Sequence, residues 1–167
     1  IHPQIIEIIK LARTKPITMV MVNTNGIRIA QDKEFVKKLS EFKGGFEIYL
    51  QFDGFKKETY VKMRGKDLRK EKLQAIENLI EAEIPMTLVS TIKKEVNEEE
   101  IGAIVKFALK TNYVRGITFQ PITFVGRYSK DLDPLNRTTL PCVIKAVEKQ
   151  TEGLFKKGDF VPLPCPY

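Results

Sequence analysis

Four short polar segments stand where β-strands are predicted to end, and they hold the amide, hydroxyl and carboxylate groups that bind polar ligands. In parallel α/β folds ligands bind at the carboxyl ends of the strands, so we expect these segments to form a site for a ribose or an amino-acid moiety. Each segment alone is also typical of an ordinary strand-to-helix turn. The segments are Asn23-Thr24-Asn25-Gly26, Gln51-Phe52-Asp53-Gly54, Ser90-Thr91-Ile92-Lys93 and Phe119-Gln120-Pro121.

The segment from Phe46 to Gly54, FEIYLQFDG, predicts a strand with two different faces, because apolar and polar residues alternate along it. A parallel sheet covered by helices on both sides would show two apolar faces. The polar row that ends in Gln51 and Asp53 therefore indicates a face that lines a cavity.

The residues that several other kinds of binding and catalytic site need are missing from the sequence. Neither GxGxxG nor GxxxxGK[ST] occurs, so the two common phosphate-binding loops are absent. His2 is the one histidine, so a Ser-His-Asp triad or a histidine metal site would need residues that this sequence lacks. Lys93 could form the Schiff base of a barrel aldolase, while Lys94 beside it favours a solvated lysine pair.

The two cysteines, Cys142 and Cys165, are too few for a disulfide scaffold and agree with a reducing compartment. Cys142 precedes an apolar run of helical spacing, which favours core packing. Prolines on both sides of Cys165 fix the backbone as in a metal-ligating turn.

Composition indicates one soluble globular domain, because 167 residues with 43% hydrophobic and 29% charged content can bury one core. No apolar run is long enough for a transmembrane segment and no signal peptide precedes the first predicted helix, so we expect a cytoplasmic protein. The net charge of +7 comes largely from lysines in helical stretches that also carry acids. No nucleic-acid partner is therefore expected, whereas attraction to anionic substrates or lipid headgroups stays open.

The pattern predicts an opening helix followed by four strand-helix units, which indicates an α/β fold with parallel strands. Asp32 is a predicted helix cap, and Asn97 with Glu100 a predicted capping box. The stretches 55–67 and 121–137 are predicted loops, and 159–167 an extended tail. Strands are predicted at 17–22, 46–54, 86–92 and 116–120, and helices at 3–13, 33–43, 68–83, 98–111 and 140–153.

A strand-helix series that opens with a helix lacks the strand before it, and four parallel strands alone leave an apolar edge unpaired. We therefore expect about four strands of a larger (β/α) barrel, with about two strands missing before Ile1 and edge-strand self-association of the isolated chain. Residues 1–137 are the predicted C-terminal portion of this barrel, and 138–167 a helix with a proline-rich tail. An open sheet of flavodoxin type is the alternative.

Four segments in order and spacing resemble the third to sixth strands of radical S-adenosylmethionine (SAM) enzymes, over roughly Ile1 to Tyr128. They are VMVNTNG, IYLQFDGF followed by YVKMRG, IPMTLVSTIKKEVNEEEIGAIVKFAL, and VRGITFQPI. The resemblance implies a (β/α)6 partial TIM barrel. It also implies a [4Fe-4S] cluster that reduces SAM to a 5′-deoxyadenosyl radical for hydrogen abstraction, with a reductant protein as partner of the intact enzyme.

The resemblance also implies a set of cofactor-binding residues. The methionine end of SAM would face Asn23, Thr24 and Asn25, and its ribose or carboxylate would lie near Gln51 and Asp53. The fifth-strand motif would hold Ser90, Thr91 and Asn97, and the adenine would lie beside Gln120 and Pro121.

The CxxxCxxC cluster loop and the Gly-Gly-Glu motif of these enzymes are absent, so we expect an inactive fragment whose cluster ligands lie outside this chain. Within the family, TFQPITFVGRY and LPCP resemble the group of tetraether lipid synthase and pterin radical methylases. That likeness implies a lipid or pterin substrate and makes Cys165 a candidate ligand of an auxiliary cluster. A non-catalytic α/β ligand-binding or interaction domain is the alternative function.

Overall fold

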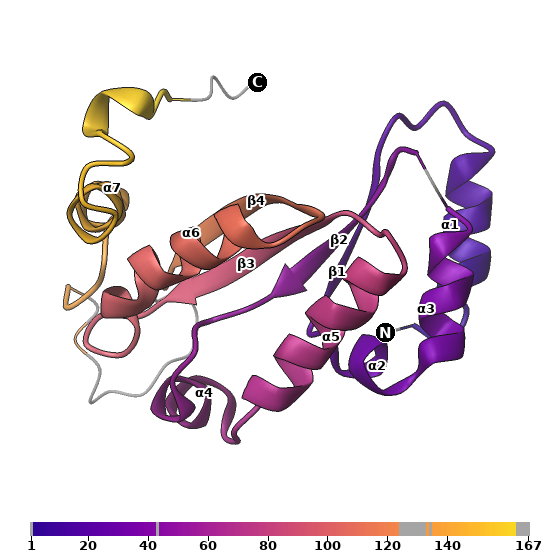
Figure 1. Ribbon diagram of the computed structural model, residues 1–167, viewed down its shortest axis with the longest axis horizontal. Helices are drawn as coiled ribbons and strands as arrows, with labels where there is room; N and C mark the ends of the chain where they lie inside the picture. The colour runs from indigo at the N-terminus through magenta and orange to yellow at the C-terminus, as the bar shows by residue number, and fades with distance from the viewer. Residues whose placement is uncertain (1, 43, 124–132, 134, 163–167) are drawn as a thin grey trace.

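The computed structural model describes residues 2–42, 44–123, 133 and 135–162. Helices and strands alternate along the described chain, as the α/β prediction requires (Figure 1). The strands are β1 (Val20–Thr24), β2 (Phe46–Gln51), β3 (Met86–Ile92) and β4 (Val114–Pro121). The helical elements are α1 (Ile5–Arg13), α2 (Ile27–Gln31), α3 (Lys33–Ser40), α4 (Lys57–Arg64), α5 (Arg69–Glu81), the 3-10 turn η1 (Glu98–Glu100), α6 (Ile101–Lys110), α7 (Leu140–Gln150) and the 3-10 turn η2 (Lys157–Asp159).

The four strands form one parallel sheet in the order β1-β2-β3-β4, which confirms the predicted α/β architecture. Each strand pairs with the next one along the chain, as in a barrel wall, with Ile48 opposite Met86. All carboxyl ends therefore lie at the same edge of the sheet. Among the described strands, β1 and β4 each have a neighbour on one side only.

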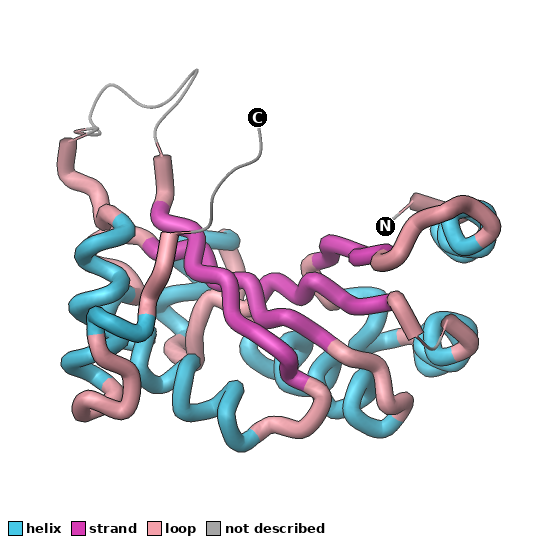
Figure 2. The backbone as a smooth tube through the Cα atoms, turned by 90° about the horizontal axis from the view of Figure 1, so that it is seen from above, coloured by secondary structure: helices cyan, strands magenta, loops and turns pink. Residues whose placement is uncertain are grey.

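The two faces of β2 meet different surroundings, as its alternating sequence predicts. Phe46, Ile48 and Leu50 are buried in the main core against residues of α3, α5 and α6, and Figure 2 shows helices packed along one side of the strands. On the opposite face, Tyr49 lines a cavity of about 440 Å³, which we call the inner-face cavity. The predicted cavity wall is thus confirmed at Tyr49, whereas Gln51 and Asp53 are not among the lining residues, and Asp53 is fully buried. The inner-face cavity is lined by Met21, Asn23, Tyr49, Thr87, Gly116, Ile117 and Thr118.

The segment after Gly54 contains helix α4, so the predicted loop over 55–67 is wrong for its larger part. Glu100 supplies the cap that this helix lacks locally: its carboxylate accepts hydrogen bonds from the N–H groups of Phe55 and Lys56 and from the Thr59 hydroxyl. A Cβ on Gly54 would lie 2.5 Å from Glu100 Oε1, so only glycine leaves room for this contact. A cap from a residue more than 40 positions away has no local sequence signal.

Asn97 and Glu100 do not form the predicted capping box. The Asn97 side chain stands at the start of η1 without capping it, and its Nδ2 donates instead to the carbonyl oxygens of Asp53 and Thr91, both at 2.8 Å. The other predicted cap is confirmed, since the Asp32 side chain accepts from Phe35 N at 2.8 Å. One of these partners, Asp53, follows β2 and lies 44 positions from Asn97, which the local pattern cannot reveal.

Helix α7 packs on α6 at a position where α6 has no side chain. The backbone N–H of Gly102 donates to Gln150 Oε1 at 2.8 Å, and Gln150 Nε2 donates to the Glu98 carbonyl oxygen at 2.8 Å. Val143 and Val147 of α7 join a second apolar cluster with residues of α6. Cys142 is exposed, so its predicted core packing is wrong.

Part of the predicted loop over 121–137 and the end of the extended tail lie outside the described residues. None of the described helices combines the length and the apolar character that a membrane crossing needs.

We predict that Gly102→Ala destabilises the protein although alanine favours helices. The new Cβ would press against Gln150 Cβ and lie 2.8 Å from the Gln150 carbonyl oxygen, so α7 must shift. The expected loss is about 1–3 kcal/mol of unfolding free energy, measured by urea denaturation. Gly158→Ala is the matched control, because no atom lies within 4 Å of its new Cβ. Equal stabilities of the two variants would contradict the close α6–α7 contact.

Candidate functional site

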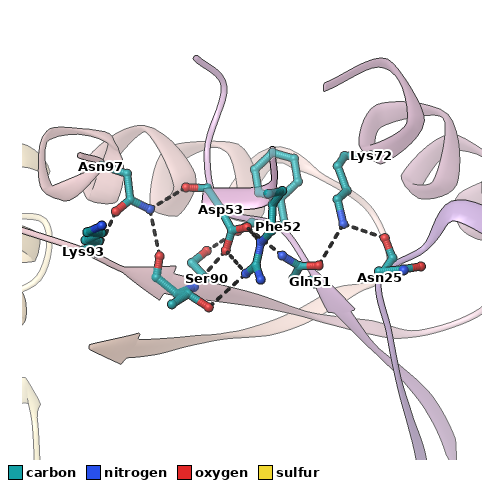
Figure 3. A network of polar contacts seen from close by, with 10 residues as sticks. Asn25, Gln51, Phe52, Asp53, Lys72, Ser90, Lys93 and Asn97 are labelled. Carbon is teal, nitrogen blue, oxygen red and sulfur yellow. Dashed lines mark hydrogen bonds and ion pairs between the residues drawn. The ribbon is translucent and has the colours of Figure 1, made fainter. Parts of the chain in front are cut away.

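The carboxyl ends of β2 and β3 meet around the side chain of Asp53, which has no exposed surface (Figure 3). Arg64 donates to this carboxylate through Nε at 2.8 Å and through an Nη at 3.2 Å. The N–H of Thr91 donates to Oδ1 at 3.0 Å, and Gln51 Nε2 donates to Oδ2 at 2.7 Å. A guanidinium and two neutral donors therefore offset the cost of burying this negative charge.

Arg64 links three elements at this edge. It is the last residue of α4, and the Nη that reaches Asp53 also donates to Thr91 Oγ1 at 3.2 Å. The Arg64 side chain is 31% exposed, whereas Asp53 is covered. The guanidinium is thus the part of this ion pair that a ligand can contact, and its donors suit an anionic or hydroxyl group.

Lys72 of α5 is fully buried and extends the network towards β1. Its Nζ donates to the Asn25 carbonyl oxygen at 2.5 Å and to Gln51 Oε1 at 3.3 Å. Burial lowers the pKa of Lys72 to about 8, and the charge of Asp53 opposes this effect in part. The Gln51 amide therefore bridges a buried lysine and a buried carboxylate, which fixes its orientation.

Ser90 and Asn97 are fully buried and use their polar groups to hold backbone. The Ser90 hydroxyl donates to the Phe52 carbonyl oxygen. Asn97 bonds two carbonyl oxygens and also accepts from Lys93 N at 2.9 Å, so each half of its amide is occupied (Figure 3). As placed, these side chains position the strand ends, and direct contact of either one with a cofactor stays a prediction.

The three candidate residues at the end of β1 differ in their exposure and in their hydrogen bonds. Asn23 is exposed and lines the inner-face cavity. Thr24 is buried and its Oγ1 accepts from Gly26 N at 3.1 Å, while Asn25 Oδ1 accepts from Ile27 N at 3.1 Å. The side chains of Thr24 and Asn25 thus shape the turn, as the ordinary-turn interpretation expects, although the Asn25 carbonyl also joins the Asp53 network through Lys72.

At the end of β4, Gln120 is exposed and Pro121 is half-buried, and in the sheet register they lie opposite Thr91 and Ile92. No side-chain hydrogen bond of the described residues joins Gln120 to the Asp53 network. Cys165, the candidate metal ligand, lies outside the described residues.

Sequence reasoning missed Arg64 and Lys72 as parts of the site. Lys72 carried a signal: it lies four residues after Leu68 and four before Ile76, so it shares the buried face of its helix with them. A lysine on such a face needs buried partners. Arg64 had no comparable signal, because its approach to Asp53 depends on α4, which the sequence did not predict.

An iron–sulfur cluster does not fit the described residues. No group of three or more His, Cys, Asp or Glu side chains that could hold a metal lies among them. Cys142 is exposed on α7 and contacts Thr139. The carboxyl ends of the strands, by contrast, offer the exposed amide of Asn23, the half-buried amide of Gln51 and the partly exposed guanidinium of Arg64. These groups suit the carboxylate and hydroxyl groups of an amino-acid nucleoside.

Parallel strands joined by helices, with a cavity on the inner face and polar carboxyl ends, define an α/β protein of the partial TIM-barrel class. The sequence model of the Radical SAM superfamily matches residues 1–108, and the chain belongs to this superfamily, as the four strand motifs predicted.

Two curated relatives refine this placement. The chain is 41% identical over 160 residues to 7,8-dihydro-6-hydroxymethylpterin dimethyltransferase of Methanocaldococcus jannaschii, covering 95% of this chain and 31% of that protein. It is 32% identical over 171 residues to a probable GTP 3′,8-cyclase of Thermococcus kodakarensis, covering 97% of this chain and 53% of that protein. The chain thus spans about a third and about half of the lengths of these relatives.

We predict that Arg64→Gln destabilises the protein strongly, because it leaves Asp53 buried without its counter-ion. The expected loss is about 3 kcal/mol of unfolding free energy, measured by urea denaturation. Arg69→Gln is the matched control, since both members of its ion pair with Asp67 reach solvent, at 43% and 33% exposure, and the pair contributes at most about 1 kcal/mol. If both variants lost equally little, the Asp53 network would not stabilise this edge.

We predict a pH-dependent stability difference between the unchanged protein and Lys72→Met. With a folded pKa of about 8 against the ordinary 10.5, folded Lys72 loses its proton at a pH where the unfolded chain still binds one. Stability due to this group therefore rises between pH 8 and pH 10.5. From pH 7.5 to 9.5 the unchanged protein should gain roughly 2 kcal/mol relative to the variant. The exposed Lys70→Met should show no such gain, and a pH-independent difference for Lys72→Met would refute the lowered pKa.

Proposed function

We propose that the carboxyl edge of β1 to β4 is the SAM-binding part of a radical SAM enzyme, whose [4Fe-4S] cluster is held by residues outside the described ones. Reductive cleavage of SAM at such a cluster supplies a 5′-deoxyadenosyl radical that abstracts hydrogen from a substrate. The Asp53–Arg64–Thr91 network at the carboxyl ends of β2 and β3 carries this proposal.

In this proposal the exposed polar atoms contact SAM and the buried ones hold them in place. Arg64 and Gln51 contact the carboxylate or ribose, with Asp53 fixing both from behind. Asn23 and the turn at Asn25 face the methionine end. Thr91 with Gln120 and Pro121 lies towards the adenine, since their strand ends are neighbours in the sheet.

We infer that the substrate is a fused heterocycle of the pterin or guanine kind and not a lipid. The two relatives are named for a dihydro-hydroxymethylpterin and for GTP. The inner-face cavity supports this substrate class, because Tyr49 and Asn23 offer an aromatic ring and an amide while no lysine, arginine or acid is among its lining residues. Such a lining suits a flat, uncharged ring with hydrogen-bonding edges.

The test uses the intact protein, prepared without oxygen and with its cluster filled. It should release 5′-deoxyadenosine from SAM in the presence of a reductant, measured by chromatography. A filled cluster without any turnover would overturn the proposed activity.

We further predict that Thr91→Val weakens SAM binding about three- to tenfold, measured by calorimetry. The valine removes the hydroxyl that orients the Arg64 guanidinium, a contact that contributes on the order of 1 kcal/mol. The matched control is Thr18→Val, an exposed threonine between α1 and β1 at the opposite edge of the sheet. Unchanged affinity of Thr91→Val would place SAM away from this edge.

A further inference from the structure

A second cavity, which we call the basic cavity, lies at the carboxyl ends of β3 and β4 and has a volume of about 380 Å³. Its wall includes the turn that begins two residues after Thr91, so it adjoins the edge proposed for SAM. Its charged lining residues are Lys62, Lys93, Lys94, Arg137, Glu95 and Asp133.

The cations of the basic cavity form no ion pair in the described part of the chain. Other lysines of the described chain pair with carboxylates, as Lys56 does with Glu99 and Lys106 with Glu152. Lys62, Lys93, Lys94 and Arg137 form no such pair within the described residues. Among the described lining residues, four cations against two carboxylates leave two positive charges in excess.

The turn that carries two of these lysines is fixed by its backbone. Val96 N donates to the Lys93 carbonyl oxygen at 3.1 Å, and Lys93 N donates to Asn97 Oδ1 at 2.9 Å. Glu95 adopts a left-handed φ of 60°, which closes the turn. The positions of Lys93 and Lys94 are therefore set by the fold and not by flexible chain.

The apolar part of the lining strengthens the interaction of the basic cavity with an anion. Ile92, which has no exposed surface, forms part of the wall together with Val96 and Ile122. Apolar surroundings lower the local dielectric, so an anion bound there interacts more strongly with the lysines than one on an open surface. A phosphate carries about −1.5 to −2 charges at neutral pH, which matches the excess of two.

We propose that the basic cavity binds a phosphate or pyrophosphate group carried by the substrate, while the inner-face cavity takes its uncharged ring. The assignment of this anion to the substrate rests on the proposed function, whereas anion binding itself does not. Lys93 and Lys94 carry the interaction from one side and Lys62 and Arg137 from the others.

The test is calorimetric binding of inorganic pyrophosphate to the intact protein. Saturable binding is expected, and Lys93→Gln/Lys94→Gln should weaken it at least tenfold. The matched control is Lys37→Gln/Lys38→Gln, which removes two adjacent exposed lysines from α3. The control should change the affinity by less than about twofold. No saturable binding, or equal losses in both double variants, would overturn the proposal.

Two further measurements identify the source of the phosphate and test the proposed SAM function independently of the basic cavity. Sedimentation with phosphatidic acid vesicles that depends on Lys93 and Lys94 would overturn the soluble substrate and favour a lipid headgroup. Its absence, with pyrophosphate still bound, supports the soluble substrate. SAM binding is measured on the same samples: SAM bound without pyrophosphate refutes the basic cavity alone, and pyrophosphate bound without SAM refutes the proposed function alone.

Discussion

Burial of the Asp53 carboxylate is the constraint on which the carboxyl edge depends. A buried charge is tolerated only where charged or strongly polar partners surround it, and here those partners come from three elements. Arg64 ties α4 to the sheet, Thr91 contributes the backbone of β3, and Gln51 connects β2 to Lys72 on α5. The same contacts that satisfy Asp53 thus fix the relative positions of the elements around the candidate site.

A second set of contacts keeps the two central strand ends at a constant spacing. Asn97 donates to the carbonyl oxygens of Asp53, which follows β2, and of Thr91, which lies within β3. Glu100 caps α4, the helix that begins after Gly54. Both residues lie at the start of the α6 segment, so one short turn supports the loops on either side of it. Preorganised strand ends lose little freedom on binding, which favours ligand affinity.

The sequence located most elements whose determining interactions are local or periodic, although it did not predict α2 and placed the first strand at 17–22 where β1 spans Val20–Thr24. Period-two alternation located β2 and its cavity-facing side, and the Asp32 cap was found because its partner is three residues away. It failed where a partner comes from far along the chain: Glu100 accepts from Lys56 N, 44 positions away, and Asn97 donates to the Asp53 carbonyl oxygen, also 44 positions away. The polar strand ends could be located from the sequence, whereas Arg64 and the distinction between exposed and buried members needed the fold, and contact of these residues with a cofactor stays a prediction.

Charge is divided between the two cavities in a way that gives a substrate an orientation. The inner-face cavity has uncharged lining around Tyr49, whereas the basic cavity concentrates cations at the carboxyl edge. A molecule with a neutral ring and an anionic substituent would gain from both surfaces in one orientation and would bury an unpaired charge in the reverse one. The edge with Arg64 belongs to the same end of the sheet, so under the proposed function the charge of a substrate would also set which part of its ring faces SAM. Under the proposed function, selectivity for such substrates would then follow from the partition of charge along the strands.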